Sequence, residues 1–405
     1  MVLELSPTDV AHGGYAVARH DGMVIFVSGA IPGERVLAEI TGKRSKLWFA
    51  RTVEVVDPSP DRVPHVWSLA ERTGIGGVDL GHVSLGASRR WKARVVEGQL
   101  ARIGHVDVPE GFAVESVGDD ETRDGLAWRT RITLVTDEAG RLGMHPPKSH
   151  DVVPVTDMPI AHEDIQDVLA RDLGGGSTRN RSIPFLADQR VSYVRPSVTT
   201  PGGESRVVTV VESRGRKGAE PVHEQVTTTH GTWEYFVSAT GFWQVHRDAP
   251  STLVQAVLDG AGEVAGPTYD LYCGAGLFAV PLSERGRVVA IEGSEQGVAD
   301  LKRNTRGLDV EAYRGDVASV LSRISDTEGG LWVLDPPRAG AGRETIEWMV
   351  RMSPDKVIYV ACDPASLARD VALLGNHGYE LANLRAFDLF PRTHHVECVA
   401  VLARP

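Results

Sequence analysis

YDLYCGAGLF, at residues 269–278, is the stretch that decides the fold of the C-terminal part of this chain. An apolar strand runs directly into a glycine turn, and the residues after the turn suit a helix. Gly274 and Gly276 allow the backbone to come close to a nucleotide-like ligand, because glycine has no side chain in the way. The stretch therefore predicts a strand–turn–helix unit that binds a nucleotide-like molecule.

The sequence around this unit alternates between strands and helices from about residue 240 onward. The strand candidates are residues 269–272, 288–292, 331–335 and 357–362, and the helical stretches between them are 295–304, 344–352 and 364–376. Such alternation predicts an α/β domain with a doubly wound, parallel sheet. We expect the last two runs, 381–390 and 396–403, to form an antiparallel ribbon at the sheet edge.

Two acidic residues follow strands of this predicted sheet. Glu292 ends the second strand, where an acid commonly binds ribose hydroxyls, so an adenosine-containing cofactor is expected. Glycine turn and acid together do not separate S-adenosylmethionine (SAM) from a nicotinamide cofactor. Asp335 lies in LDPPRAG at 334–340, where two prolines stiffen the loop and hold the carboxylate in place. A dehydrogenase has no need of this element.

Cys362 ends the fourth strand candidate and stands just before a predicted helix. Asp363 suits the N-cap and Pro364 the first helical position, so we expect the helix end to lower the pKa of the thiol. From its position alone, Cys362 is equally well explained as a buried structural cysteine. Glu397, near the C-terminus, lies on or beside a strand, where a solvent-facing side chain is the simpler alternative.

The first 240 residues are predicted to form two further domains. Residues 1–57 are a small β-barrel of the oligonucleotide-binding type, and residues 58–240 are a central α+β region preceding the domain at 241–405. The strand candidates are 24–27, 36–40, 51–56, 129–136, 152–155, 190–194 and 207–212, with a helix near 88–103 and loops at 174–176 and 213–220. A basic, aromatic stretch at 43–51 is a local candidate for contact with nucleic acid.

Composition narrows the classes of protein that this chain can represent. The net charge of −11 over 405 residues argues against nucleic-acid binding by the whole surface, but not by a local patch. No apolar run approaches the ~20 residues of a membrane helix, and no signal peptide is expected. The three cysteines form no disulfide framework, so a cytoplasmic location is expected. Nothing in the sequence points to an oligomeric state.

Taken together, these segments resemble the SAM-dependent RNA 5-methyluridine methyltransferases that act on bacterial ribosomal and transfer RNA. The resemblance rests on FWQV at 242–245, the glycine turn at 270–278, DPPR at 335–338, the segment 359–370 and HVE at 395–397. Residues 13–34 resemble the TRAM domain, an RNA-binding barrel that many members carry. The resemblance covers residues 1–60 and 240–405 and is thin between them.

This resemblance implies a role for each matching residue. Cys362 would be the nucleophile and Glu397 the base. The matching cofactor positions are Gln244, Tyr272, Glu292 and Asp335, with Gly274 and Gly276 in the turn and Asp316 near the adenine. In the implied reaction the thiolate adds to carbon 6 of uracil, carbon 5 takes the methyl group of SAM, and the base removes the carbon-5 proton. The uridine must be single-stranded or flipped out of its stack.

The sequence departs from the family pattern at several positions. Many members carry an iron–sulfur cluster after the TRAM domain, but the matching stretch at 75–79 has no cysteine, so no cluster is expected. Leu277 stands where a polar residue is frequent, Asp363 replaces the usual Asn, and His246 stands where Asn is common. These departures bear on cofactor contacts and base recognition, and they leave the Cys–Glu pair in place.

Three hypotheses follow. The first is an RNA uridine-C5 methyltransferase that uses SAM, with 23S ribosomal RNA ahead of transfer RNA as its partner. The second is a SAM-binding, RNA-binding or ribosome-assembly protein without catalysis. The retained pair of Cys362 and Glu397 argues against it, because such a protein needs neither residue. The third, a nicotinamide dehydrogenase, rests on the glycine turn alone.

Overall fold

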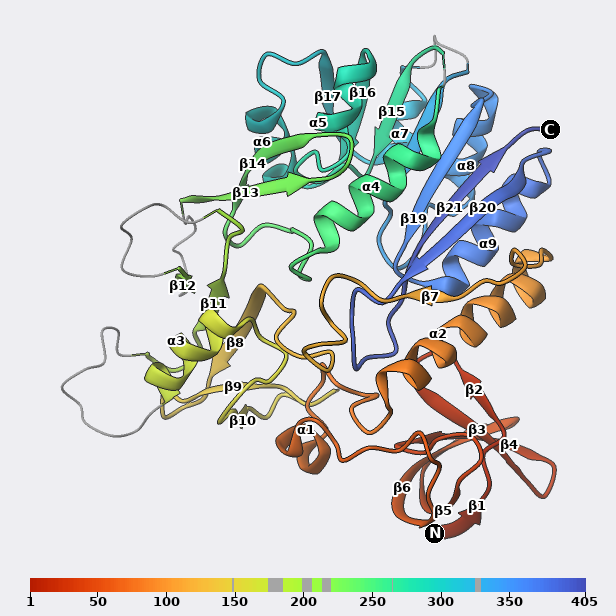
Figure 1. Cartoon of the computed structure of the whole chain (residues 1–405), viewed down its shortest axis with the longest axis vertical. Helices are drawn as coiled ribbons and strands as arrows, with labels where there is room; N and C mark the ends of the chain where they lie inside the picture. The colour runs from red at the N-terminus through yellow and green to blue at the C-terminus, as the bar shows by residue number, and fades with distance from the viewer. Residues whose placement is uncertain (148, 174–184, 199–205, 213–219, 264, 325–328) are drawn as a thin grey trace.

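The computed structural model of the chain describes residues 1–147, 149–173, 185–198, 206–212, 220–263, 265–324 and 329–405. Figure 1 shows an N-terminal sheet, a central sheet and a larger C-terminal sheet flanked by helices. The predicted loop at 174–176 lies outside the described residues, and so does the predicted loop at 213–220 except for its last residue, Glu220. Within those ranges, no helix is both long and apolar enough to cross a membrane.

The N-terminal sheet has the strand order β1-β5-β6-β4-β3-β2. Its strands are β1 (Val2–Leu5), β2 (Asp9–Ala11), β3 (Tyr15–His20), β4 (Met23–Ser28), β5 (Arg35–Lys43) and β6 (Leu47–Asp57). Alternate residues of these strands are buried, for example Ala16 and Ala18 in β3, because successive strand side chains point to opposite faces. The predicted strands at 24–27, 36–40 and 51–56 are confirmed as parts of β4, β5 and β6.

A buried helix connects the N-terminal sheet to the rest of the chain. The connection contains α1 (Ser68–Thr73), α2 (Leu85–Gln99) and a π-helical turn (Leu100–Gly104), so the helix predicted near 88–103 is confirmed. Helix α2 is buried on two sides. Trp91 and Val95 pack into the core of the N-terminal sheet, whereas Ala93 and Val96 pack into the core of the C-terminal sheet.

The central sheet is antiparallel and has the order β10-β9-β8-β11-β12. This part contains β8 (Arg131–Thr136), β9 (Leu142–Met144), β10 (Val153–Pro154), α3 (Glu163–Leu173), β11 (Arg190–Val194) and β12 (Val208–Glu212). The four strands predicted in this part are confirmed. A hairpin that was not predicted follows, formed by β13 (Pro221–Thr227) and β14 (Thr232–Ser238).

The C-terminal sheet is the doubly wound sheet that the sequence predicts. Its strands are β15 (Thr268–Leu271), β16 (Val288–Glu292), β17 (Val310–Arg314), β18 (Leu331–Leu334), β19 (Lys356–Ala361), β20 (Glu380–Phe387) and β21 (Glu397–Ala403). Its helical segments are α4 (Ala249–Ala261), α5 (Ala279–Leu282), a 3-10 turn (Ser283–Arg285), α6 (Glu295–Asn304), α7 (Val317–Leu321), α8 (Gly342–Arg351) and α9 (Pro364–Gly375). Strands β15 to β19 run parallel, and β21 is antiparallel to β19.

The C-terminal ribbon is not at the sheet edge. The strand order is β17-β16-β15-β18-β19-β21-β20-β7, so a short strand from much earlier in the chain, β7 (Val114–Glu115), covers β20. The predicted antiparallel pairing of the ribbon is confirmed, but the predicted edge position was wrong. Two paired residues are too short a segment to leave a strand pattern in the sequence.

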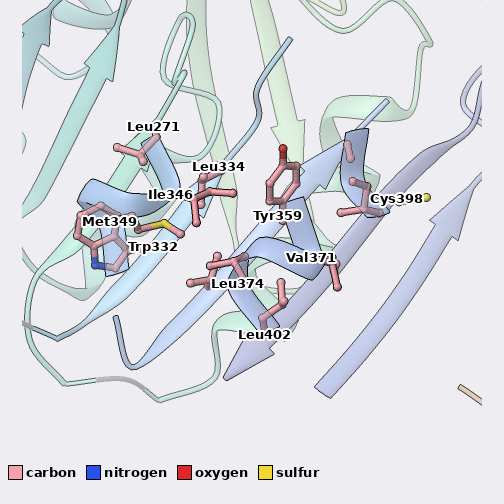
Figure 2. Packing of buried hydrophobic residues seen from close by; sticks show 14 of the residues in the cluster. Leu271, Trp332, Leu334, Ile346, Met349, Tyr359, Val371, Leu374, Cys398 and Leu402 are labelled. Carbon is pink, nitrogen blue, oxygen red and sulfur yellow. The ribbon is translucent and has the colours of Figure 1, made fainter. Parts of the chain in front are cut away.

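Apolar side chains from both the sheet and its helices hold the strand ends in place (Figure 2). Trp332 and Leu334 of β18 pack with Met349 of α8 and with Val371 and Leu374 of α9, and all five are almost fully buried. A core packed this closely resists small displacements. The residues that follow the strands therefore project from a rigid platform.

Candidate active site

A large cavity opens where the parallel strands end. Its volume is about 1220 Å³, and it is lined by residues that follow β15, β16, β18 and β19 and by residues of the loop after β14. The central sheet forms another part of its wall through residues such as Ile132 and Met144. In open α/β sheets the carboxyl ends of the strands form the ligand crevice, and the cavity lies at that edge.

The turn after β15 adopts backbone conformations that favour glycine. Tyr272, Gly274 and Gly276 have φ values of 61°, 55° and 89°. A Cβ atom added to Gly276 would lie 2.8 Å from Cδ1 of Leu301, so this glycine is required for packing beneath the turn. A Cβ atom added to Gly274 would meet nothing within 4 Å, and this residue lines the cavity. The turn thus offers a bare stretch of backbone to a ligand.

Glu292, at the end of β16, is fixed beside this turn. Its carboxylate accepts hydrogen bonds from the N–H of Gly274 at 2.9 Å and from the N–H of Ser294 at 2.6 Å. Each carboxylate oxygen retains a second lone pair, so the group is still able to accept hydrogen bonds from ribose hydroxyls. The glycine turn with its exposed backbone, the fixed carboxylate of Glu292 and the volume of the cavity together fit an adenosine-containing ligand.

The other predicted cofactor residues divide into two groups. Tyr272, Gln244 and Asp335 line the cavity, and Gln244 is buried. Burial, and then the charge of Glu292, raise the pKa of Asp335 to about 7. Asp316 does not line the cavity; it is exposed and accepts the Ser319 N–H at 3.0 Å as the N-cap of α7. Gly276 is not among the residues that line the cavity.

Cys362 and Glu397 face each other across two neighbouring strands. The antiparallel pairing of β19 with β21 sets Ala361 opposite Cys398, so the next position of the ladder sets Cys362 opposite Glu397. Directly opposed strand residues have Cβ atoms about 4.5–5.5 Å apart. Cys362 is half-buried, Glu397 is 3% exposed, and both line the cavity together with Asp335.

The environment of Cys362 disfavours the thiolate. Burial, followed by the charges of Glu397 and Asp335, raises the pKa of Cys362 to about 12, although Arg338 acts in the opposite direction. The expectation that the helix end lowers this pKa was therefore wrong, because desolvation and two carboxylates outweigh the helix. Burial and the charge of Asp335 also raise the pKa of Glu397 well above its usual range.

Two departures from the family pattern have clear structural roles. Asp363 is the N-cap of α9, as predicted, and accepts the Ser366 N–H at 2.8 Å. His246 is buried, stacks on Trp128 with ring centroids 5.8 Å apart, and lies with Nε2 2.9 Å from a carboxylate oxygen of Asp120. His246 does not line the large cavity, so its contacts join parts of the chain rather than reach a ligand there.

The third departure and the stretch at 75–79 also contribute to packing. Leu277 is buried, and its carbonyl accepts the Tyr235 hydroxyl at 2.9 Å. Ile75 and Val78 lie in the apolar core of the central sheet. Across the described part of the chain, no group of three or more His, Cys, Asp or Glu side chains is placed to hold a metal ion.

Several cavity residues were not predicted as site residues. Arg338 belongs to the DPPR segment and donates to Nε2 of His395 at 3.3 Å. Phe242 lies at the cavity and is 74% exposed, next to the predicted Gln244. Arg129 reaches the cavity from the residues before β8. The segments FWQV and DPPR pointed toward the first two, whereas no motif marks the third.

The basic stretch at 43–51 forms the hairpin between β5 and β6. Lys43 Nζ lies 4.2 Å from the centroid of the Trp48 ring, and the Arg44 guanidinium lies 5.7 Å from that of Phe49. Phe49 belongs to an aromatic group with Tyr15 on the same sheet, with ring centroids 5.7 Å apart. Cations and partly exposed rings of this kind suit the backbone and the bases of a single-stranded nucleic acid.

Comparison with known sequences gives matches along most of the chain. Residues 323–405 match the profile of the tRNA (uracil-5-)-methyltransferase family. A Bifidobacterium longum protein described as an uncharacterized RNA methyltransferase is 38% identical, and the alignment covers 97% of this chain and 95% of that protein. The 23S rRNA (uracil(1939)-C(5))-methyltransferase RlmD of a Shewanella species is 30% identical, with coverage of 96% and 93%.

Comparison with solved structures supports the fold. The Pyrococcus abyssi tRNA (uracil-54, C5)-methyltransferase, solved with S-adenosyl-L-homocysteine, superposes with a TM-score of 0.72 at 20% sequence identity. The superposition covers 99% of this chain and all of that one, so both share the methyltransferase fold along their whole length.

Proposed function

This chain belongs to the RNA (uracil-5-)methyltransferase family, and from that premise we propose that it methylates carbon 5 of a uridine in 23S ribosomal RNA through a covalent adduct on Cys362. SAM-dependent methylation of uracil in RNA is the reaction of the family. The observation that carries the proposed mechanism is the placement of Cys362 opposite Glu397 at the wall of one cavity.

We assign the cofactor to the part of the cavity around the glycine turn. SAM supplies an electrophilic methyl group on a positively charged sulfur. Gly274 lets the backbone approach the adenosine part, Gly276 lets the turn pack closely on Leu301, and Glu292 accepts hydrogen bonds from the ribose. The remaining contacts are assigned to Tyr272, Gln244 and Asp335, which line the cavity.

The thiol of Cys362 first gives up its proton to solvent, and the thiolate sulfur then forms a bond to carbon 6 of the uracil. The electron pair of the C5–C6 double bond moves toward the carbonyl at carbon 4, which makes carbon 5 electron-rich enough to take the methyl group as the bond between that methyl group and the sulfur of SAM breaks. Glu397 then removes the carbon-5 proton as a general base. The bond between sulfur and carbon 6 breaks, the thiolate leaves, and the double bond is restored.

Once ionised, Glu397 is a stronger base than a carboxylate in water, because burial and the charge of Asp335 raise its pKa. A carboxylate held in a buried site has a stronger affinity for a proton than one in water, and Glu397 is 3% exposed. Because Glu397 lies opposite Cys362, the atom that the sulfur attacks and the proton that is later removed belong to neighbouring carbons. One flipped uracil is therefore within reach of both side chains.

RNA contacts are assigned to the N-terminal part of the chain. We propose that residues 1–57 form the TRAM-type barrel, that 58–240 form the central domain, and that 241–405 form the catalytic domain. The hairpin between β5 and β6 carries cations and aromatic rings in one place, which supports backbone contact and base stacking there. A base in a stacked helix is out of reach of Cys362, so the uridine must leave its stack.

We propose ribosomal RNA rather than transfer RNA as the substrate. The Shewanella enzyme that acts on 23S rRNA is 30% identical to this chain, whereas the Pyrococcus tRNA enzyme is 20% identical. An alignment at 30% identity that covers 96% of the chain supports the ribosomal assignment more than a shared fold at 20% identity supports the transfer-RNA assignment.

A direct assay tests both parts of the proposal. The purified protein is incubated with SAM and, separately, with unmodified 23S rRNA and unmodified tRNA, and the nucleosides are measured by mass spectrometry after nuclease digestion. We expect 5-methyluridine in the ribosomal sample. Its appearance in tRNA alone would reverse the substrate assignment, and its absence from both samples, with SAM binding intact, would favour the non-catalytic hypothesis.

A further inference from the structure

A polar junction joins the N-terminal sheet to the turn that carries Cys362. His12 lies in the turn between β2 and β3, and its Nε2 is 3.0 Å from Oδ2 of Asp363. Asp363 directly follows Cys362 in the chain. A side chain of the N-terminal sheet thus contacts the residue next to the assigned nucleophile.

Asp363 is held from two directions. Its Oδ1 accepts the Ser366 N–H at 2.8 Å, which caps α9, and its Oδ2 faces His12. Burial acts to raise the pKa of Asp363, but the hydrogen bonds from His12 and Ser366 outweigh burial and lower this pKa to about 2. Asp363 is therefore an anion at neutral pH, and His12 donates the proton of their hydrogen bond. With both oxygens engaged, the peptide between Cys362 and Asp363 has little freedom to move.

The turn that presents His12 fits closely against the rest of the chain. Gly14 has a φ of 77°, and a Cβ atom there would lie 2.9 Å from Oδ2 of Asp79 and 3.3 Å from Cβ of His394. The same Asp79 oxygen accepts the His394 N–H at 3.0 Å, and the His12 and His394 rings meet edge to face at 6.1 Å. The ring contact of His12 with His394 and the close approach at Gly14 thus accompany the link from His12 to Asp363, which is not an isolated pair.

From this geometry we propose that His12 is a positioning residue for the methyl-transfer reaction. His12 lies in the β2–β3 turn of the N-terminal sheet and fixes the turn that carries Cys362. The proposal rests on the proposed function, because it assigns the turn to the nucleophile. The N-terminal sheet then does more than add affinity for RNA, since it completes the support of the active site. Misplacement of a reacting group by about 1 Å costs on the order of 10²-fold in rate, so a loosened turn has a measurable effect.

Hydrogen exchange tests the mechanical part without any catalysis. We compare the full-length protein with His12→Ala, with His12→Gln, which keeps a side-chain N–H donor, and with His20→Ala as a matched control. His20 lies on the same sheet, is 38% exposed against 37% for His12, and has only Asp21 of its own hairpin near its Nε2, at 3.6 Å, among the described residues. We expect the amides of residues 363 and 365–367 to exchange several-fold faster in His12→Ala, and to keep wild-type protection in His12→Gln and His20→Ala.

Steady-state kinetics with the RNA substrate test the catalytic part. We expect His12→Ala to lower kcat about tenfold with little change in KM for RNA, because positioning acts on the chemical step. His12→Gln should recover most of the lost rate, and His20→Ala should equal the wild type.

Two results would overturn the proposal. One is unchanged exchange of residues 363 and 365–367 in His12→Ala. The other is a raised KM for RNA with an unchanged kcat, which would make His12 an RNA-binding residue only. A wild-type protein that forms no 5-methyluridine would instead refute the proposed function, and the exchange experiment alone would then decide whether the N-terminal sheet fixes the turn.

Discussion

Cys362 and Glu397 act at different moments of the proposed reaction, so their variants should fail in different ways. Cys362→Ala removes the atom that attacks carbon 6, and we expect the rate of 5-methyluridine formation to fall at least about 10³-fold while SAM binding persists. Glu397→Gln permits attack and methyl transfer but not proton removal, so a covalent protein–RNA adduct should accumulate. Denaturing electrophoresis with a labelled methyl group detects that adduct. Normal activity of Cys362→Ala would disprove the mechanism.

The charge of Asp335 contributes to the low reactivity of Cys362, after burial and the charge of Glu397. The carboxylate of Asp335 raises the pKa of the thiol, so Asp335→Asn should lower that pKa and increase the thiolate fraction, about tenfold for each unit of the shift. Because the pKa of Asp335 is itself about 7, the wild-type carboxyl is mostly charged at pH 8 and mostly neutral at pH 6. We therefore expect faster alkylation of Cys362 by iodoacetamide in the variant at pH 8, and little difference at pH 6.

Mass spectrometry of the peptide that contains Cys362 measures its alkylation rate separately from those of the other two cysteines. Cys273 and Cys398 are buried and should react slowly. Asp309→Asn is the control, because Asp309 is exposed and precedes β17, at the opposite edge of the sheet from the cavity. Equal rates in Asp335→Asn and the wild type at pH 8 would show that Asp335 does not suppress the thiolate.

At the scale of elements, the hairpin between β5 and β6 should carry much of the RNA affinity. We expect the triple variant of Lys43, Arg44 and Lys46 to alanine to bind RNA more weakly and to lower the salt dependence of binding by up to about three phosphate contacts. The measurement is RNA affinity at several salt concentrations. The control triple variant replaces Arg287, Arg306 and Arg351, which lie at the edge of the C-terminal sheet where its parallel strands begin. If the control variant lost as much RNA affinity as the hairpin variant, the hairpin would have no special role in RNA binding.

The sequence predicted most of the C-terminal sheet because each buried parallel strand is a short apolar run bounded by turn residues. It did not predict the β13–β14 hairpin, whose turn at 228–231 lacks the Asn-Gly or Asp-Gly pair that marks tight hairpins. Nor did it predict α4, which enters its helix through Asp248 without a side-chain cap bond.

The sequence predicted the residues on only one wall of the cavity, the wall formed by the C-terminal sheet. The residues that follow the strands could be placed because the fold brings strand ends together. The opposite wall, with Arg129 and Met144, depends on how the central sheet docks, and no local pattern encodes that arrangement. The raised pKa of Cys362 likewise arises from burial and then from the charges of Glu397 and Asp335, and none of these is visible in the local sequence.

At the scale of the whole molecule, a buried ion pair joins α2 to the end of β20. Lys92 pairs with Asp388 and also donates to the Phe390 carbonyl at 3.0 Å, and neither charged side chain is more than 2% exposed. We expect Lys92→Met to lower the free energy of unfolding by about 3–5 kcal/mol, because it leaves a buried carboxylate without its partner. The double variant Lys92→Met, Asp388→Leu should recover most of that loss.

Denaturant unfolding at neutral pH measures both effects. Arg94→Met is the control on the same helix, since its ion pair with Asp9 is largely exposed and such pairs contribute at most about 1 kcal/mol. A loss in Lys92→Met no larger than that of the control would show that the buried pair does not hold the parts of the chain together.

Helix α2, which belongs to the cores of both the N-terminal and the C-terminal sheets, restricts how such a chain can change by recombination. A breakpoint at residue 57 would exchange the strands of the N-terminal sheet and leave the face with Trp91 and Val95 unchanged. An N-terminal sheet from a different protein would then have to pack against this apolar face of α2, which fits the original sheet. Exchange or loss of the N-terminal sheet during evolution therefore requires matching substitutions along one face of α2. Sequence differences on that face should accompany differences in the N-terminal sheet.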